Sequence, residues 1–413
     1  MEVVYHNCCG IDVHAKFLLA CLLRDGEKQV RKFSTMTSDL MRLGDWLVSE
    51  GCTRVAIEST GVYWKPVFNV LESALTVILV NPEHAKALRG RKTDRKDCIR
   101  LAELLSVNLL EPSFIPPPHI RRLREMTRYR ESLSRTRTAV ANRIQKVIES
   151  GNIKLGQVAS DVLGSSGKAM LRALAAGATD PEVIAQLARG SLRKKMADLE
   201  LALRGDMNTA QRFVLGELLQ RVKELEAADD KVSGQISQAI GNGEHPELFE
   251  GWELLQTIPG IGESVAEVVI AEIGVNLREV FPTAGHLASW GGVCPGNKAT
   301  GGKRLSGKTR KGNRYLRAAV VQAAWAATHT KNTSLNAMYR RLVRRLGKKK
   351  ALIAVAHAIT VIIYNVLVRK EPYKELGADY FERNNSDKQR KYLVKRLEAL
   401  GYNVVLEQNV EAA

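Results

Sequence analysis

The sequence predicts a mixed α/β domain at the N-terminus, followed by a longer region built from helices. In residues 1–115, short apolar runs alternate with segments of helical periodicity. Three consecutive prolines at 116–118 then break the chain, and the periodicity beyond them is almost wholly helical. With 413 residues the chain can bury more than one core. We expect a catalytic domain over 1–115, a helical or coiled-coil linker over 116–250, a second chemical domain over 251–345 and a helical extension over 346–413.

The first domain is predicted to contain three strands in a meander, then helix, strand, helix, strand and helix. The meander strands are the apolar runs 9–13, 17–23 and 30–33, with the turn signal Asp25-Gly26 before the third. Later elements follow from periodicity and are expected as helices at 40–48 and 62–71 and strands at 54–58 and 75–80. A last helix is expected to carry Asp94 and Asp97.

Four acids occupy positions that this order of elements can bring together. Asp12 lies on the first strand, Glu58 ends the fourth, and Asp94 and Asp97 share one face of a first helical turn. Carboxylates gathered at one edge of a sheet would hold two divalent cations for in-line attack on phosphorus. Basic residues that suit a polyanion flank the late acids, namely Arg91, Lys92, Arg95 and Lys96. Taken alone, that last stretch equally fits a helix start with favourable acids and solvated bases.

Bulk properties favour a nucleic-acid partner and a cytoplasmic location. The net charge is +18 and the pI is about 9.7. Six cysteines show no metal-ligand spacing, so we expect reduced thiols, and the N-terminus lacks a signal-peptide pattern. The apolar run 351–368 approaches the length of a membrane span, but it contains His357, Tyr364 and Asn365. We therefore expect a buried core helix there and no membrane association.

Two long helices are predicted in the middle of the chain. The first, 121–150, is rich in arginine and suits either a nucleic-acid backbone or an ordinary solvated face, with no preference between them. The second, 215–240, has apolar residues in steps of three and four. This seam predicts a helical hairpin or coiled coil that could also pair with another subunit. Between them, residues 151–212 are helical by composition.

Two features of the C-terminal half suit nucleic-acid chemistry. The turn that contains Gly260 and Gly262, with a helix at 264–273, resembles a helix-hairpin-helix whose backbone amides could take a phosphate. The alternative is a glycine-rich turn between packed helices. The stretch 287–317 has no acids and carries a dense basic patch: Lys303, Arg304, Lys308, Arg310, Lys311 and Arg314. A hydroxyl there could attack a phosphate, but the residues alone favour a phosphate-binding loop without a covalent step.

The segments GIDVHAK, AIESTGVYWKPV and GRKTDRKD resemble the DEDD-type insertion-sequence transposases, the IS110 family, which are relatives of the pilin-gene invertase. The resemblance implies a RuvC-like, ribonuclease-H-type fold for the first domain. It also implies that Asp12, Glu58, Asp94 and Asp97 bind Mg²⁺.

The stretch 287–317 resembles the mostly helical C-terminal transposase domain of the same family, which carries a nucleophilic serine. The family pattern reads close to GNNESAGKRKSG, where this chain has GNKATGGKRLSG. Thr300 stands at the serine position, and its extra methyl group restricts χ1 and crowds an attack. Either Thr300 or Ser306 is therefore expected to supply the nucleophile, with Thr300 preferred.

The function expected from this resemblance is that of a DNA transposase or recombinase with a covalent protein–DNA intermediate. The resemblance further implies a guide (bridge) RNA that pairs with donor and target DNA, and a homo-oligomer, either tetramer or dimer. Two alternatives remain open. One is a RuvC-like metal-dependent nuclease or resolvase that uses water. The other is a non-catalytic nucleic-acid-binding protein with a degenerate site.

Overall fold

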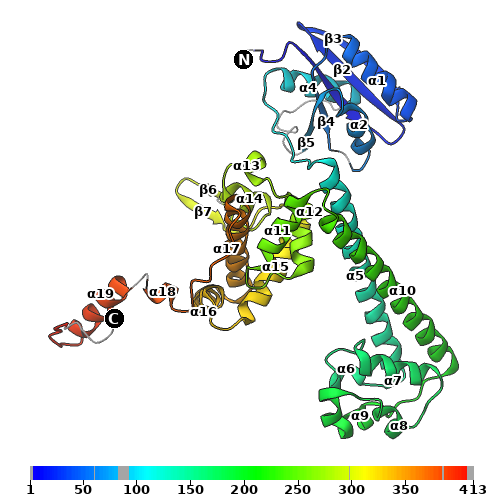
Figure 1. Cartoon of the computed structure of the whole chain (residues 1–413), viewed down its shortest axis with the longest axis vertical. Coiled ribbons are helices and arrows are strands. Elements are labelled where there is room, and N and C mark those ends of the chain that lie inside the picture. Colours follow the sequence, from blue (N-terminus) through cyan, green and yellow to red (C-terminus); the bar gives the residue numbers. More distant parts are fainter. Residues whose placement is uncertain (1–2, 60, 82–92, 297, 384–385, 407–413) are drawn as a thin grey trace. The chain divides into compact units, whose positions relative to one another are not determined.

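The chain divides into two compact units, Met1–Ile115 and Pro116–Ala413, which are described separately (Figure 1). The computed structural model describes residues 3–59, 61–81, 93–296, 298–383 and 386–406. The first unit is a mixed α/β sheet domain and the second is almost wholly helical, as the sequence predicts. All six cysteines are free.

The sheet of the first unit has the strand order β3-β2-β1-β4-β5. Its first three strands form the predicted antiparallel meander, while β4 runs parallel to β1 and β5 runs parallel to β4. The strands are β1 (Asn7–Val13), β2 (Phe17–Arg24), β3 (Glu27–Ser34), β4 (Arg54–Glu58) and β5 (Thr76–Val80). Asp25 and Gly26 join β2 to β3 with positive φ angles of 47° and 90°, which is the geometry of a two-residue hairpin turn.

Helices cover both faces of this sheet. They are α1 (Thr37–Ser49), α2 (Trp64–Leu71) and α4 (Asp94–Ser106). One apolar core joins α1 and α2 to the face that contains Cys9, Ile11 and Val13. A second core joins α4 to the opposite face, which contains Cys8. Because successive side chains of a strand point to opposite faces, both cores are built from the same few strands.

The second unit begins with two long helices that pack along one another, α5 (Pro118–Ser150) and α10 (Thr209–Gly241). A group of short helices lies between them in the sequence and shares their core: α6 (Leu155–Val158), α7 (Ser165–Ala175), α8 (Pro181–Ala185), η1 (Gly190–Lys195) and α9 (Met196–Ala202). Figure 1 shows this group at one end of the pair. The predicted seam on α10 is thus used within the chain, because Val222 and Leu225 are buried in this core.

The remaining helices follow α10 in the same unit, and all but the last of them pack together. They are α11 (Pro246–Gln256), α12 (Glu263–Ile273), α13 (Leu277–Val280), α14 (Ala284–Trp290), α15 (Arg314–His329), α16 (Ser334–Leu346), α17 (Lys348–Arg369), α18 (Tyr380–Arg383) and α19 (Ser386–Glu398). Two short strands, β6 (Lys298–Thr300) and β7 (Lys303–Ser306), pair as a hairpin.

Helix α17 is the predicted apolar helix. It is the one described helix long and apolar enough to cross a membrane, and half of its most apolar 18-residue stretch is buried inside the protein. It packs against α11, α14, α15 and α16. The tyrosine hydroxyl of Tyr364 donates to the backbone carbonyl of Phe281 over 3.0 Å. These contacts are those of a core helix.

Candidate functional site

Asp12 lies on the face of the sheet that α4 covers. Along β1, Cys8 belongs to the core beneath α4, whereas Cys9, Ile11 and Val13 belong to the opposite core. Alternation along the strand therefore directs Asp12 toward α4. Its side chain is nearly buried, since the residue is only 7% exposed.

Glu58 lies beside Asp12 on the neighbouring parallel strand. The strand register pairs Ile11 with Ile57, so the next residues along, Asp12 and Glu58, stand at the carboxyl ends of β1 and β4. Ala56 belongs to the core beneath α4 and Ile57 to the opposite core. Glu58 consequently shares the α4 face with Asp12.

Asp94 and Asp97 are placed by the start of α4, which begins at Asp94 as predicted. Thr93 caps the helix by accepting a hydrogen bond from the Lys96 backbone amide. Both acids lie in the first turn, where the helix dipole favours negative charge. Gly10 on β1 lets this helix approach, because a Cβ there would stand 2.3 Å from the carbonyl oxygen of Cys98.

The three other acids act on the pKa of Asp12. Burial raises this pKa above its ordinary value of 3.8, and the carboxylates of Glu58, Asp94 and Asp97 raise it further, while His14 opposes them. Asp12 and Asp94, together with His14, offer ligand atoms that all lie within 4.8 Å of one another, so this group can hold a divalent cation. We call Asp12, Glu58, Asp94 and Asp97 the acid cluster.

His14 lies beside the acid cluster, although its sequence position predicts no role for it. Its Nε2 atom lies 3.3 Å from Asp12 Oδ2 and 3.3 Å from Asp94 Oδ2. This nitrogen is buried, and neither contact is a directed hydrogen bond. The ring is held against Phe17, with 4.6 Å between the ring centroids. Strand alternation could have found it, since residue 14 follows Asp12 by two.

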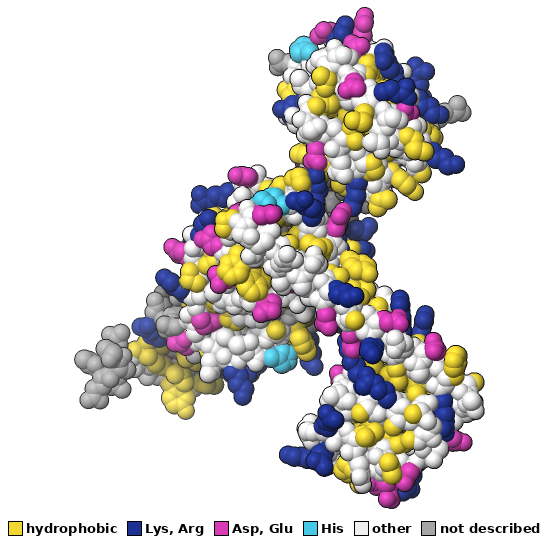
Figure 2. Space-filling model, turned by 45° about the vertical axis from the view of Figure 1, so that its right-hand side comes forward, with side chains coloured by type: hydrophobic (Ala, Val, Ile, Leu, Met, Phe, Trp, Pro, Cys, Tyr) yellow, Lys and Arg dark blue, Asp and Glu magenta, His cyan; other side chains and the backbone are white. Residues whose placement is uncertain are grey.

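The basic residues predicted around the acid cluster are only partly described. Arg95 and Lys96 are exposed in the first turn of α4. Arg91 and Lys92 lie outside the described residues. On the face drawn in Figure 2, Lys and Arg side chains are spread over both units, with acidic side chains among them. The basic charge is thus not confined to the predicted patches.

The predicted hydroxyl residues lie on the β6–β7 hairpin. Gly301 and Gly302 form its two-residue turn with φ angles of 53° and 75°, as a tight hairpin requires. Thr300 pairs with Lys303 beside this turn, and Ser306 pairs with Lys298 at the other end. Thr300 and Ser306 are both exposed. The Ser306 hydroxyl oxygen accepts a hydrogen bond from the Lys308 backbone amide over 3.1 Å.

The predicted basic patch follows this hairpin. Lys303, Lys308, Arg310 and Lys311 are exposed, whereas the Arg304 side chain lies outside the described residues. Arg314 is exposed as well, and its guanidinium lies 4.7 Å from the centroid of the Tyr315 ring. The hairpin therefore carries hydroxyls and cations on one short element.

Close backbone contacts fix the base of the hairpin. A Cβ on Gly312 would lie 2.4 Å from the Gly292 amide nitrogen, so only glycine allows the two strands of chain to meet there. Beyond that contact, Asn313 caps α15 by accepting from the backbone amides of Tyr315 and Leu316. The amide group of Asn313 donates to Glu272 Oε2 over 2.6 Å. The end of the hairpin segment is thus tied to α12.

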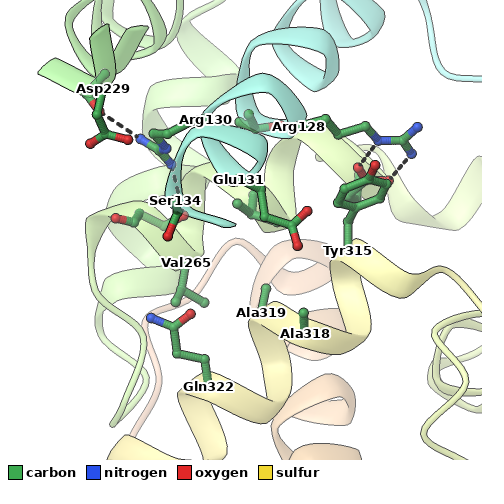
Figure 3. A pocket seen from close by; sticks show the side chains of 15 residues that line it. Arg128, Arg130, Glu131, Ser134, Asp229, Val265, Tyr315, Ala318, Ala319 and Gln322 are labelled. Atoms are coloured by element: carbon green, nitrogen blue, oxygen red, sulfur yellow. Dashed lines mark hydrogen bonds and ion pairs between the residues drawn. The ribbon is translucent and has the colours of Figure 1, made fainter. Parts of the chain in front are cut away.

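Glu272 is fully buried and is the centre of an ionic network. Arg128 binds it with two parallel hydrogen bonds of 2.8 Å, and Arg124 Nε lies 3.5 Å from Oε2. Burial lowers the pKa of Arg124 to about 10, with Glu272 opposing that shift. Arg128 also lies 4.3 Å from the Tyr315 ring centroid. Figure 3 shows this side of a pocket of about 350 Å³ between α5, α10, α12 and α15.

These contacts change the interpretation of the arginine-rich helix. Besides Arg124 and Arg128, Arg130 pairs with Glu267 on α12, and Arg137 pairs with Glu226 on α10. Half of the eight arginines counted along this helix therefore hold helices together. The sequence predicts only nucleic acid or solvent as the surroundings of these arginines.

Gly260 is also engaged in packing. Its φ angle is +90°, and a Cβ there would lie 2.2 Å from the backbone oxygen of Ala323 on α15. Gly262 has open space around it and precedes the first residue of α12. The helices α11 and α12 are joined by a short turn, as the motif predicts. This close packing supports the alternative explanation for Gly260, which is a glycine-rich turn between packed helices.

Two family models that match this chain both describe transposases. A family model described as "Transposase", of the DEDD IS110 type, matches residues 9–152. A second, described as "Transposase IS116/IS110/IS902 family", matches residues 252–340. Together the two matches cover more than half of the chain. The first spans all four acids of the cluster, and the second spans the hairpin.

Several relatives are also named as transposases or as a gene-inverting protein. The transposase for insertion sequence element IS1111A of Coxiella burnetii is 24% identical over 381 residues, which cover 89% of this chain and 87% of the relative. A probable family 20 transposase of Pseudomonas aeruginosa is 26% identical, covering 78% and 85%. The pilin gene-inverting protein of Moraxella bovis is 28% identical over 131 residues, covering 31% and 40%.

Proposed function

The chain belongs to the IS110 family of transposases, and from this premise we propose that it cuts and rejoins the DNA strands of an insertion sequence with two chemical centres. One centre is the acid cluster, which takes Mg²⁺. The other is a hydroxyl on the β6–β7 hairpin. The observation that carries the proposal is geometric: Asp12, His14 and Asp94 offer ligand atoms that all lie within 4.8 Å of one another, at the carboxyl end of β1 and the start of α4.

The acid cluster is the metal-binding centre of this proposal. Its two strand-borne acids come from parallel strands and its other two from one helical turn, so their backbones are held by regular structure. Bound Mg²⁺ would polarise a phosphate oxygen and stabilise the charge that develops in phosphoryl transfer. The strand order, with an antiparallel meander beside two parallel strands, supports the RuvC-like assignment of this unit.

The hairpin supplies the nucleophile. We assign this role to Thr300, because it stands beside the turn and is exposed, whereas the Ser306 hydroxyl already accepts a backbone hydrogen bond. A bond forms between Thr300 Oγ1 and phosphorus while the bond from phosphorus to the sugar oxygen breaks. The hydroxyl loses its proton and the departing sugar oxygen gains one. The exposed Lys303 and Lys308 stabilise the charge on the phosphate.

The remaining partners follow from the family. We propose a guide (bridge) RNA that pairs with donor and target DNA, and a dimer or tetramer in which the acids of one subunit act with the hydroxyl of another. A net charge of +18 supports attraction to both nucleic acids. A role for α11 and α12 as a helix-hairpin-helix belongs to the same proposal, with the open space at Gly262 as its support.

A second candidate is a metal-dependent nuclease that uses water. The observation that favours it is the threonine at position 300, since its methyl group crowds an attack. Under this alternative the acid cluster alone carries the chemistry.

A covalent-trapping assay separates the two. The purified protein, with RNA transcribed from its own flanking region, is mixed with labelled matching DNA and Mg²⁺ and then denatured. We expect a protein–DNA adduct that persists in Ser306→Ala and is lost in Thr300→Ala and Asp12→Ala. Cleaved DNA without an adduct would establish the water-using nuclease instead. Intact DNA under all conditions would contradict both.

A further inference from the structure

A second group of metal-ligating side chains lies in the helical unit and shares no residue with the acid cluster. His119 is in the first turn of α5, His245 directly precedes α11, and Glu247 is in the first turn of α11. Each of the three can offer one ligand atom, and these atoms all lie within 4.8 Å of one another. We call these residues the histidine cluster.

The two imidazole rings are held face to face. Their centroids are 3.9 Å apart and the ring planes differ by 21°. His245 Nδ1 also lies 3.3 Å from Glu247 Oε1. Two protonated rings would repel one another at this distance, so the arrangement requires at least one neutral ring. A neutral imidazole keeps a lone pair that can bind a metal.

The surroundings of His119 agree with a neutral ring. Its pKa is lowered from 6.5, first by burial, then by His245 and Arg122, while Glu247 acts in the opposite direction. All three members of the histidine cluster are half-buried. The cluster is thus shielded from bulk water and remains reachable by an ion.

The ligand types select the class of ion. Two imidazoles and one carboxylate suit a borderline transition-metal ion such as Zn²⁺, and they leave one of four positions open for water. A hard ion such as Mg²⁺ prefers oxygen ligands throughout. Because the rings are nearly parallel, binding requires one of them to turn about χ2 so that both nitrogens face the ion.

The position of the cluster suggests what a bound ion would do. His119 stands where α5 begins, and His245 follows within a few residues of the end of α10. These two helices pack along one another. An ion held by both histidines would join the start of α5 to the segment that connects α10 with α11. The positive ends of α5 and α11 oppose a cation there, but Glu247 supplies compensating charge.

We propose that His119, His245 and Glu247 form a three-ligand site for a Zn²⁺-class ion, with water in the fourth position, and that the bound ion fastens the base of the α5–α10 helix pair. The proposal is independent of the chemistry at the acid cluster. It concerns different residues, and its readouts are metal binding and thermal stability.

The test uses the full-length chain with Asp12→Asn and Asp94→Asn, so that the acid cluster does not compete for the ion. Metal-free protein is titrated with Zn²⁺ against a chromophoric chelator. We expect about one equivalent to bind. Its association constant should fall by about tenfold or more in His119→Ala, in His245→Ala and in Glu247→Gln. His286→Ala is the matched control, because it removes an exposed histidine of the same unit that lies outside the cluster.

Two further measurements keep the test decisive if a variant is poorly folded. Zinc-edge X-ray absorption of the parent protein should show two imidazoles in the first coordination sphere. The melting temperature of the parent should rise with one equivalent of Zn²⁺, and that rise should be absent in Glu247→Gln, which keeps both rings. An absence of stoichiometric binding, or binding that all three variants retain, would overturn the proposal.

Discussion

Gly10 and Cys98 stand so close that a Cβ on Gly10 would lie 2.3 Å from the Cys98 carbonyl oxygen. The same added atom would lie 2.4 Å from the backbone nitrogen of Ala102. Both neighbours are backbone atoms of α4, so a rotamer change cannot relieve the clash. This contact sets the spacing between β1, which carries Asp12, and α4, which carries Asp94 and Asp97.

Gly10→Ala should therefore damage both stability and the acid cluster. Helix α4 must shift to make room, which costs about 1–3 kcal/mol as overpacking does in other cores. The shift moves Asp94 and Asp97 relative to Asp12, so Mg²⁺-dependent DNA cleavage should fall more than the fraction of folded protein does. Thermal unfolding and cleavage rates, measured on the same preparations, give the two effects separately.

Gly44→Ala is the control for this substitution. Gly44 lies within α1 of the same unit, and a Cβ there would meet only a side-chain carbon of Leu71 at 3.4 Å. Alanine favours a helix interior over glycine by roughly 0.5–1 kcal/mol, so stability should be unchanged or slightly higher. Equal losses in Gly10→Ala and Gly44→Ala would contradict the role assigned to Gly10.

Asp12→Asn should raise the stability of the metal-free protein while strongly slowing DNA cleavage. The folded-state pKa of Asp12 is above the ordinary 3.8, chiefly through burial. Ionisation of Asp12 therefore opposes folding. Asp12 favours the folded state most below its unfolded-state pKa, where it is protonated, and this part of the free energy of unfolding is lost as the pH rises through the folded-state pKa. At pH 7 in a chelator, Asp12→Asn should melt at a higher temperature than the wild type. That difference should narrow as the pH is lowered toward the folded-state pKa.

Adding Mg²⁺ should make the wild type melt at a higher temperature than Asp12→Asn. A ligand that binds only the folded state stabilises it, by about 2.7 kcal/mol at a hundred times its dissociation constant. Wild type should gain this stability and the variant should not. The cleavage rate of Asp12→Asn should be lower by about 100-fold or more, as for the loss of one stabilising contact in a transition state. A variant that melts below the wild type in chelator would refute the assignment of a repulsive, metal-requiring cluster.

The four acids could be proposed as a group from the sequence because strand ends and helix starts are local properties. Asp12 and Glu58 come from predicted strands and Asp94 and Asp97 from a predicted helix start, while their metal-binding role is implied by the family resemblance. The raised pKa of Asp12 agrees with that assembly. His14 was not predicted, because the sequence pattern that defines the acid cluster contains only carboxylates.

The ionic network of the helical unit could not be predicted in this way. Arg128 and Glu272 are 144 residues apart, and no local pattern connects them. An arginine on a helix looks the same in sequence whether it faces DNA, water or a buried carboxylate. The partner, and thus the role, depends on how α5, α12 and α15 pack together.

Glu272→Gln should destabilise the helical unit strongly. The substitution leaves Arg124 and Arg128 without their carboxylate, and breaking a buried ion pair costs about 3–5 kcal/mol. We expect a value near 3 kcal/mol, since the Arg128 side chain is 36% exposed. The loss of helical signal on heating, followed by circular dichroism, measures the effect. Glu224→Gln, which removes a surface partner of Arg221 on α10, should leave the transition unchanged.

A small effect of Glu272→Gln would mean that the network does not hold these helices together. The hairpin provides a second readout, because Asn313 links its base to Glu272. Proteolysis within residues 294–312 should be faster in Glu272→Gln than in Glu224→Gln at a temperature where both remain folded.

Thr300→Ser should retain the protein–DNA adduct and form it at least as fast as the wild type. Serine keeps the hydroxyl and removes the methyl group that restricts χ1 and crowds an attack on phosphorus. Thr300→Val keeps the size and branching of threonine and removes the oxygen, so it should form no adduct. Because Thr300 is exposed beside the hairpin turn, neither change should alter the melting temperature. Single-turnover adduct formation, followed by denaturing electrophoresis, measures the rates. An adduct in Thr300→Val that disappears in Ser306→Ala would transfer the nucleophile to Ser306.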